Sequence, residues 1–244
     1  MLLLAIDTAT SAITVALHDG ARVLAQESVV DPRAHGEQLA PAVQRALSAG
    51  GVTPADVTHV VAGIGPGPFT GLRVGLVTAR VFAWARGLPA YGVCSLDALA
   101  QATYEPRPDG GPVPPGATGT HPLLVATDAR RREIYWARYE LAPDRRLVRT
   151  AGPAVGRAAD LPEEVRALPC AGRGPLLYPD ALTNPHGPLD VAAGALADLA
   201  VARLAAGENL DPPEPLYLRR PDAVPTPAKP VSASEPAPAG RPTR

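Results

Sequence analysis

The sequence is poor in several residue types, and each shortage excludes a class of protein. It contains two cysteines, Cys94 and Cys170, so a disulfide framework is not expected and both are interpreted as buried thiols. Aromatic residues make up 4% of the chain, so the core must be built mainly from alanine, valine and leucine. No apolar run approaches the roughly 18 residues of a membrane-spanning helix, so no membrane span is expected.

The sequence also lacks an excess of charge of either sign. The formal net charge of the 244 residues is −1 at pH 7, so the chain as a whole lacks the basic surface typical of nucleic-acid-binding proteins. Lys229 is the only lysine, so nearly all positive charge comes from arginine. The N-terminal segment has no basic residue before Asp7, which favours a core strand over a signal peptide. These features predict a cytoplasmic protein that does not associate with membranes.

Apolar periodicity in the first hundred positions predicts three strands followed by alternating helices and strands. Asp19-Gly20 is typical of a hairpin turn between the second and third strands. The expected strands are 2–6, 13–17, 23–29, 57–62 and 90–93, and the expected helices are 38–49, 72–86 and 95–102. We expect Ser95 to cap the last of these helices. This order of elements is typical of a ribonuclease-H-like fold.

The start of the chain recurs after a segment rich in proline and glycine. Residues 123–128 resemble residues 2–7 at an offset of 121, and the same offset pairs Ile13 with Ile134 without a gap. The repeat predicts a duplicated α/β fold with two lobes, in which Asp7 and Asp128 end matching strands.

The second lobe is expected to be a degraded copy of the first. It has short predicted strands at 147–155 and 168–171, and a helix at 190–206 that Asp190 caps. This helix belongs to the second lobe in sequence but is free to pack back on the first. The predicted segments are an N-terminal lobe, a Pro/Gly-rich linker, a C-terminal lobe and an extended tail, at 1–103, 104–122, 123–210 and 211–244. Composition predicts disorder from about residue 222.

The most informative segment is the glycine-rich stretch 63–75, which lies between a predicted strand and a predicted helix. Free N–H groups at the start of a helix form a ready anion site. However, no Gly-Lys-Ser/Thr follows, and Pro66 and Pro68 each remove an N–H donor. The segment indicates a scaffold derived from a nucleotide-binding fold. The candidate nucleotide or phosphate contacts are Asp7, Gly65, Gly67 and Thr70, and the alternative role for Asp7 is to cap the turn that follows it.

Five segments, in this order along most of the chain, resemble the TsaB (YeaZ) family. They are Leu4–Thr10, His35–Pro41, Gly65–Gly75, Asp128–Trp136 and Pro215–Arg219. The third, GPGPFTGLRVG, is similar to the GPGSFTGLRxG signature of that family. Pro68 and Gly36 stand where the family usually has serine, which puts any role of those hydroxyl groups in doubt.

The resemblance implies a fold of the actin/Hsp70/sugar-kinase superfamily and a place in tRNA modification. It implies a non-catalytic dimerization subunit of the complex that forms N6-threonylcarbamoyladenosine at position 37 of tRNAs reading ANN codons. The implied partners are the transferase TsaD in a heterodimer, the ATPase TsaE, and tRNA through the complex, with a homodimer as a further candidate. No tightly bound cofactor is implied, since ATP and magnesium are used through the partners.

Two other functions stay open at this point. Asp7 and the glycine-rich segment fit a sugar-kinase-like, ATP-dependent phosphotransferase. A metallopeptidase is a third interpretation, but no two histidines lie four residues apart, as a helical metal pair requires. No set of nucleophile, base and metal ligands is complete, so no catalytic residue and no metal ligand is assigned.

A row of small residues suggests where a partner binds. Gly71, Gly75, Ala79 and Ala83 recur every four residues and form one ridge on the predicted helix. Glycine inside a helix costs about 1 kcal/mol relative to alanine, so Gly75 calls for a close contact. That contact is either internal, against the sheet, or external. We favour a partner helix, with Ala42 and Ala46 of the preceding helix beside the ridge.

Arginine is densest between Arg130 and Arg157. This window contains eight arginines and three acidic residues, an excess of 8 − 3 = 5 positive charges. Within this window Arg130, Arg131 and Arg132 are candidate contacts to tRNA. The alternative is a solvated turn.

Overall fold

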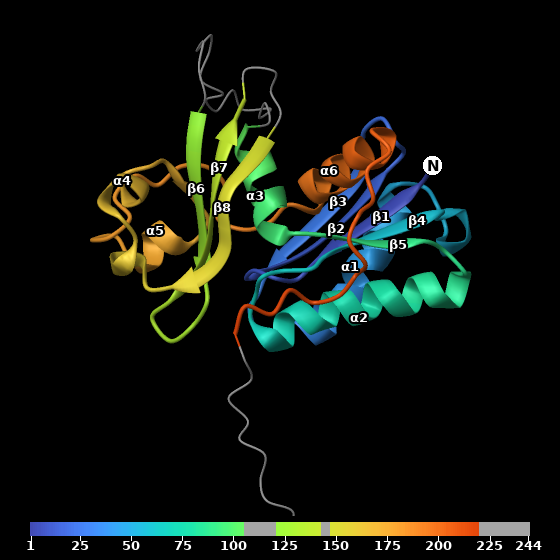
Figure 1. The fold of residues 1–244 in the computed structure, drawn as a ribbon. Helices are drawn as coiled ribbons and strands as arrows, with labels where there is room; N and C mark the ends of the chain where they lie inside the picture. The colour runs from blue at the N-terminus through green and yellow to red at the C-terminus, as the bar shows by residue number, and fades with distance from the viewer. Residues whose placement is uncertain (105–120, 143–146, 220–244) are drawn as a thin grey trace, which may run out of the picture.

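Two mixed β-sheets stand side by side in the computed structural model of the chain (Figure 1). The structure describes residues 1–104, 121–142 and 147–219. Most of the predicted linker and the predicted disordered tail lie outside these residues. The two sheets confirm the predicted α/β fold with two related lobes.

The first sheet has the strand order β3-β2-β1-β4-β5. Its strands are Leu3–Asp7 (β1), Ala12–His18 (β2), Val23–Val30 (β3), His59–Gly63 (β4) and Ala90–Val93 (β5). The first three strands are antiparallel, whereas β4 lies parallel to both β1 and β5. The continuous apolar sequence of β1 follows from its central place, since both faces of the sheet are covered there.

Helices cover both faces of the first sheet (Figure 1). Helices His35–Ala49 (α1) and Phe69–Arg86 (α2) pack on one face, and Ala193–Ala205 (α6) packs on the other. Helix Ser95–Tyr104 (α3) lies between α6 and the second sheet. Both α1 and α2 begin about one turn before the predicted positions. The prediction followed apolar periodicity, and the first turn of each helix has few apolar core residues to reveal it. A short 3₁₀ helix, Pro54–Asp56, precedes β4.

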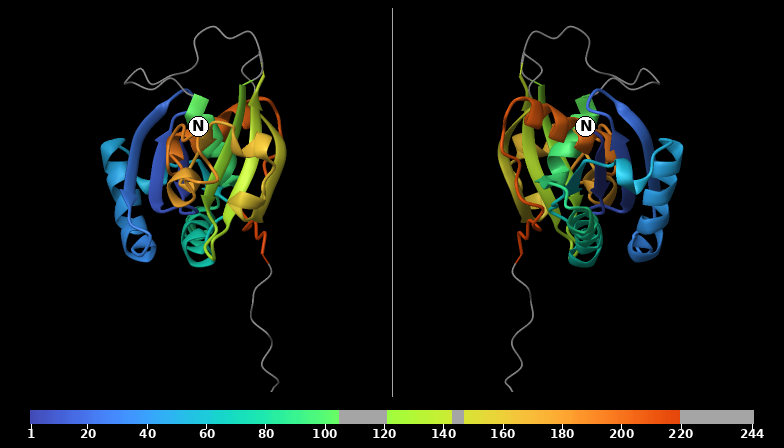
Figure 2. Two further views of the ribbon diagram at one scale, coloured as in Figure 1. Left: turned by 90° about the vertical axis from the view of Figure 1, so that its left-hand side faces the viewer. Right: turned by 90° about the vertical axis from the view of Figure 1, so that its right-hand side faces the viewer.

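The second sheet has the order β8-β7-β6-β9. Its strands are His121–Asp128 (β6), Ile134–Leu141 (β7), Leu147–Gly156 (β8) and Cys170–Ala171 (β9). Its outer face is covered by a 3₁₀ helix, Ala158–Asp160, and by the short helices Glu163–Arg166 (α4) and Gly174–Leu177 (α5). Helices α3 and α6 fill the space between the sheets, where the largest core includes residues of both lobes (Figure 2).

Helix α6 is attached to the first lobe by polar contacts as well as by its apolar face. The hydroxyl of Thr14 accepts a hydrogen bond from the Ala193 amide at 3.1 Å, and the side-chain oxygen of Gln26 accepts one from the Gly194 amide at 2.8 Å. Strand side chains therefore satisfy the first N–H groups of the helix. The prediction that Asp190 caps it is wrong, since the helix begins at Ala193 and has no cap from its own side chains.

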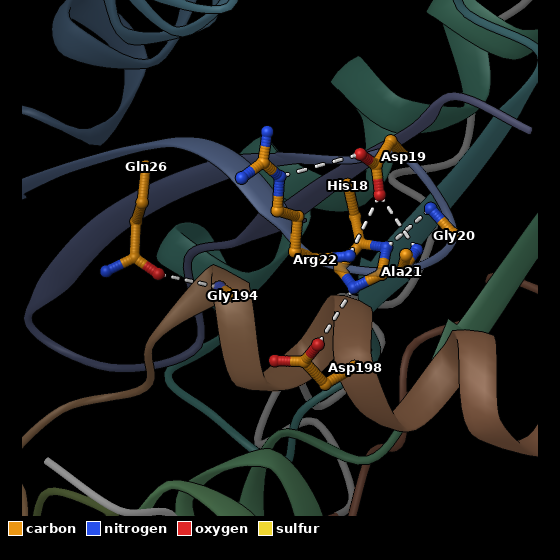
Figure 3. Close-up of polar contacts among 8 residues, drawn as sticks. All are labelled: His18, Asp19, Gly20, Ala21, Arg22, Gln26, Gly194 and Asp198. Atoms are coloured by element: carbon orange, nitrogen blue, oxygen red, sulfur yellow. Dashed lines mark hydrogen bonds and ion pairs between the residues drawn. The ribbon is translucent and has the colours of Figure 1, made fainter.

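His18 fixes the middle of α6 (Figure 3). Its Nδ1 accepts a hydrogen bond from the Gly20 amide at 2.9 Å, and its Nε2 lies 2.8 Å from a carboxylate oxygen of Asp198. The proton of the neutral ring therefore sits on Nε2 and is donated to Asp198. With both ring nitrogens engaged, this buried histidine serves as an anchor and not as a base.

The duplication is confirmed, but its register differs from the gapless alignment. Asp7 ends β1 and pairs with Thr14, whereas Asp128 ends β6 and pairs with Ile134. The turn after Asp128 is thus one residue shorter than the turn after Asp7, so the gapless alignment cannot match both the strand ends and the strands that follow. Ile13 and Ile134 both lie in the outer core of their lobe, as their pairing predicts. The shorter turn places Arg130, Arg131 and Arg132 in the left-handed region, at φ of 60°, 55° and 61°.

The C-terminal segment 211–219 joins the two lobes. The carbonyl of Asp211 accepts a hydrogen bond from the Gly92 amide at 2.7 Å, and the Leu216 amide donates to the Ile64 carbonyl at 2.8 Å. Arg219 then reaches the second lobe, where it donates to the Ala129 carbonyl at 2.9 Å and pairs with Glu133. We call residues 211–219 the strap.

Candidate functional site

The row of small residues on α2 faces the interior of the protein. The Thr8 hydroxyl donates to the Gly71 carbonyl at 2.7 Å and accepts from the Gly75 amide at 2.9 Å. The hydroxyl thereby bridges the Gly71 carbonyl and the Gly75 amide, which in a regular helix would be hydrogen-bonded to each other. A Cβ atom on Gly75 would lie 2.4 Å from the Thr8 hydroxyl oxygen, so only glycine fits there.

The rest of the predicted partner interface, apart from Gly71, is buried as well. Gly75, Ala79 and Ala83 are covered by the chain's own packing, and Ala42 and Ala46 of α1 are fully buried; Gly71 lies close to Thr8 and His35. The structure contradicts the prediction that the buried residues face a partner, whereas Gly71 is only partly buried. Small residues let α1, α2 and the turn after β1 approach one another, which is the internal alternative.

The opposite side of α2 carries an exposed apolar stripe, which consists of Val77, Val81 and Trp84. Their side chains are 57%, 56% and 83% exposed, although valine and tryptophan are usually covered. They lie at helical spacing, about 200° around the helix from Gly75. Helix α2 contains Arg73, Arg80 and Arg86 but no acidic residue. Helix α2 lies at the edge of the molecule (Figure 2). Its exposed side there is apolar, and the helix as a whole is basic.

An aromatic and cationic cluster lies at the start of α2. Phe69 stacks on Tyr217 of the strap with ring centroids 5.4 Å apart, and the Arg73 guanidinium lies 3.8 Å from the Phe69 ring centroid. The Arg73 Nε donates to the Tyr217 hydroxyl at 2.8 Å. This cluster anchors the strap to the first lobe. The PLYLR segment that the sequence singled out therefore holds the lobes together.

A cleft of about 240 Å³ separates the lobes. The first lobe contributes the turn 8–11, Pro32, His35 and the start of α2 at 68–71. The second contributes Thr127, Asp128, Arg130, Arg173, Leu189 and Asp190. Of the predicted nucleotide contacts, only Thr70 lines this cleft. The structure contradicts the contacts predicted for Asp7, Gly65 and Gly67, which are all buried.

Asp7 is an internal structural group. Its carboxylate accepts a hydrogen bond from the Ser95 hydroxyl at 2.5 Å and another from the Ala9 amide at 2.8 Å. The Ser95 hydroxyl in turn accepts from the Gly65 amide at 3.1 Å, so it joins the glycine-rich turn to β1 instead of capping α3 as predicted. Complete burial raises the pKa of Asp7 to about 6, although the hydrogen bonds from Ser95 and Ala9 oppose the rise.

We expect this carboxyl to make stability depend on pH. Because its pKa is raised in the folded state from 3.8 to about 6, folding binds a proton, and the stabilisation present at low pH is lost as pH rises through 6. The loss amounts to about 3 kcal/mol. Urea unfolding should show the difference in stability between Asp7→Asn and the wild type growing in favour of the variant between about pH 4 and pH 7. Parallel pH profiles would show that Asp7 does not titrate in this range.

The prediction of buried thiols is confirmed. Cys94 and Cys170 are free and buried, and burial raises the pKa of each to about 12, which leaves them unreactive. Within residues 1–104, 121–142 and 147–219, no three His, Cys, Asp or Glu side chains gather to hold a metal ion. Every helix in the same part of the chain is too short or too polar to cross a membrane.

Sequence reasoning missed several residues that shape this region. Thr8 lies in the segment Leu4–Thr10 and Ser95 was expected to cap a helix, but their actual roles depend on residues 63 and 88 positions away. The exposed stripe had a signal in the sequence, since Val77, Val81 and Trp84 repeat at helical spacing. The interface was instead predicted on the opposite face of the same helix, because the row of small residues lies there.

Comparison with known proteins gives the family. Residues 24–187 match the family model described as TsaD, tRNA N6-adenosine threonylcarbamoyltransferase. The solved structure described as YeaZ from Pseudomonas aeruginosa superposes with a TM-score of 0.70 at 30% identity, covering 89% of this chain and all of that one. The chain belongs to the TsaB (YeaZ) family.

Curated relatives agree with this assignment. The tRNA threonylcarbamoyladenosine biosynthesis protein TsaB of Escherichia coli (strain K12) is 39% identical over 140 residues, which cover 57% of this chain and 55% of that protein. An uncharacterized protein of Mycobacterium tuberculosis (strain H37Rv) is 44% identical over 226 residues, covering 91% and 93%. The superposition on YeaZ supports the α/β architecture with two lobes that the sequence predicted.

Proposed function

We propose that this TsaB-family chain is the non-catalytic, dimerizing subunit of a complex that forms N6-threonylcarbamoyladenosine in tRNA. The observation that carries the proposal is the exposed stripe Val77, Val81 and Trp84 on α2, which is an apolar surface without an internal role. Large exposed apolar side chains grouped on one helix face are typical of a protein–protein interface.

The proposed partner is a TsaD-type protein. The TsaD family model matches residues 24–187, which include both α1 and α2, so such a partner carries counterparts of these helices. Two related chains can then pack α2 against α2 in a nearly symmetric, isologous contact. The same surface serves a homodimer, and we propose that the two assemblies compete for it.

The proposed lack of catalysis rests on the position of Asp7. The aspartate that would hold the metal of a nucleotide is enclosed by Ser95, Ala9 and Gly63, where even a Cβ on Gly63 would overlap its carboxylate. The sugar-kinase alternative needs this carboxylate at the cleft surface. We therefore propose that ATP and magnesium are used by the partners, including a TsaE-type ATPase.

Reconstitution tests the proposal. We expect the purified chain to leave tRNA unmodified, and a mixture with TsaD and TsaE proteins, threonylcarbamoyl-adenylate and ATP to form the modified nucleoside at position 37. Mass spectrometry of digested tRNA provides the readout. Transfer by the isolated chain would contradict the non-catalytic role, and full activity of TsaD and TsaE without this chain would contradict its place in the complex.

Contact of Arg130, Arg131 and Arg132 with tRNA stays a prediction. Arg219 donates a hydrogen bond to the Ala129 carbonyl and so holds the turn that contains the three arginines. Replacing Arg131 and Arg132 by Gln should weaken binding of tRNA to the complex. The slope of log affinity against log salt concentration should become shallower by about one unit for each lost phosphate contact. Filter binding at several salt concentrations measures both. Unchanged affinity and slope would indicate a solvated turn.

A further inference from the structure

The wall of the cleft formed by the second lobe presents two pairs of opposite charges. Arg130 lies 3.0 Å from Asp128, and Arg173 donates two hydrogen bonds to Asp190, at 2.9 and 2.6 Å. All four side chains line the cleft, and Asp190 is only 12% exposed. The wall is therefore strongly polar but neutral overall. It offers both a cation and an anion to whatever lies against it.

The opposite wall includes the start of α2. The Leu72 amide donates the first hydrogen bond of this helix, to the Pro68 carbonyl, so the amides of Phe69, Thr70 and Gly71 precede the ladder. The first turn has neither a side-chain cap nor an acidic residue. The positive end of an 18-residue helix thus faces the charged pairs, and it favours a negative group between the walls.

A buried hydroxyl lies behind the charged wall of the cleft. Thr127 lines the cleft and is 4% exposed, and its Oγ1 finds no hydrogen-bond partner among the described residues. An unpaired buried hydroxyl costs free energy, and native proteins usually satisfy such groups. This oxygen is enclosed, so the charged pairs and the start of α2, and not the hydroxyl, are the groups that a ligand in the cleft can contact.

We propose that the cleft binds a small zwitterion of the α-amino-acid class. Its carboxylate would lie between the start of α2 and the guanidinium groups of Arg130 and Arg173. Its ammonium would face Asp128 and Asp190. A zwitterion satisfies both signs of charge, whereas a phosphate dianion would also have to face the two carboxylates.

The size of the cleft supports this choice. Its volume of about 240 Å³ is below the range of roughly 300–1,000 Å³ that is typical of sites for drug-sized ligands. A small amino acid can be accommodated in a cleft of this size. The inference is independent of the proposed function, because it requires no partner protein and no tRNA.

Binding to the full chain tests the inference. Glycine, L-alanine, L-threonine and L-leucine are titrated by calorimetry and by ligand-observed NMR, followed by the N-acetyl and amide derivatives of the tightest binder. The first derivative lacks the ammonium and the second lacks the carboxylate. We expect saturable binding of at least one amino acid and a loss of at least tenfold in affinity for each derivative. Inorganic phosphate and AMP are compared in parallel.

A paired substitution tests the location. Arg173→Gln with Asp190→Asn removes one charge pair while keeping side-chain size, and should weaken binding at least tenfold. Arg45→Gln with Glu27→Gln is the control, because this ion pair of 2.8 Å lies outside the cleft. If the first variant fails to fold, Arg130→Gln with Asp128→Asn replaces it. The proposal is overturned if no amino acid binds saturably, if the derivatives bind equally well, if phosphate or AMP binds more tightly, or if the cleft variant retains full affinity.

Discussion

Val81→Arg is expected to abolish binding to a TsaD-type partner while leaving the monomer folded. Val81 is in the middle of the exposed stripe, so an arginine there would place an unpaired cation at the centre of the proposed interface. We expect affinity to fall by about 100-fold or more, the effect of losing an interface hot spot. Arginine is also a better helix former than valine, so the stability of the isolated chain should not decrease.

Leu176→Arg is the matched control. Leu176 is 60% exposed, close to the 56% of Val81, but it lies on α5 of the second lobe. Analytical ultracentrifugation of each variant with the partner, together with circular dichroism of the variant alone, separates binding from folding. Wild-type affinity in the Val81→Arg chain, or an equal loss in the Leu176→Arg chain, would show that the interface lies elsewhere.

Gly75→Ala is expected to destabilise the isolated protein. The added Cβ would lie 2.4 Å from the Thr8 hydroxyl and would displace the side chain that bridges α2 to the turn after β1. Overpacking of this kind typically costs about 1–3 kcal/mol, and Gly75→Leu should cost more. Chemical denaturation of the purified chain measures the loss. A folded Gly75→Leu monomer of wild-type stability would restore the partner-facing interpretation of the ridge.

Two comparisons make this result specific. Gly36 lies in α1, and a Cβ added to it would meet no atom within 4 Å, so Gly36→Ala should stabilise the protein by about 0.5–1 kcal/mol. In a Thr8→Ala background the cost of Gly75→Ala should shrink, because the clashing hydroxyl is gone. Additive costs would mean that the two residues do not interact.

The repeating patterns in the sequence predicted the elements and the duplication, but they did not show which helix face is covered. Gly75 and Ala79 fit an internal and an external helix contact equally well, because a small residue permits close approach from either side. Thr8 decides between the two, and its contact with Gly75 spans 67 positions. The nucleotide contact predicted for Asp7 is wrong for a related reason, since its burial depends on Ser95 in a distant helix. Local patterns do not report contacts of this range.

The attachment of α6 bears on how the protein is made. The sheet of the first lobe is complete in sequence by Val93, yet one of its faces is covered by residues 193–205, which the ribosome adds about a hundred positions later. At typical synthesis rates of roughly 5–20 residues per second, that face of the nascent chain stays uncovered for several seconds. The first lobe is therefore not a separable folding unit, because it cannot bury this face of its sheet until α6 emerges.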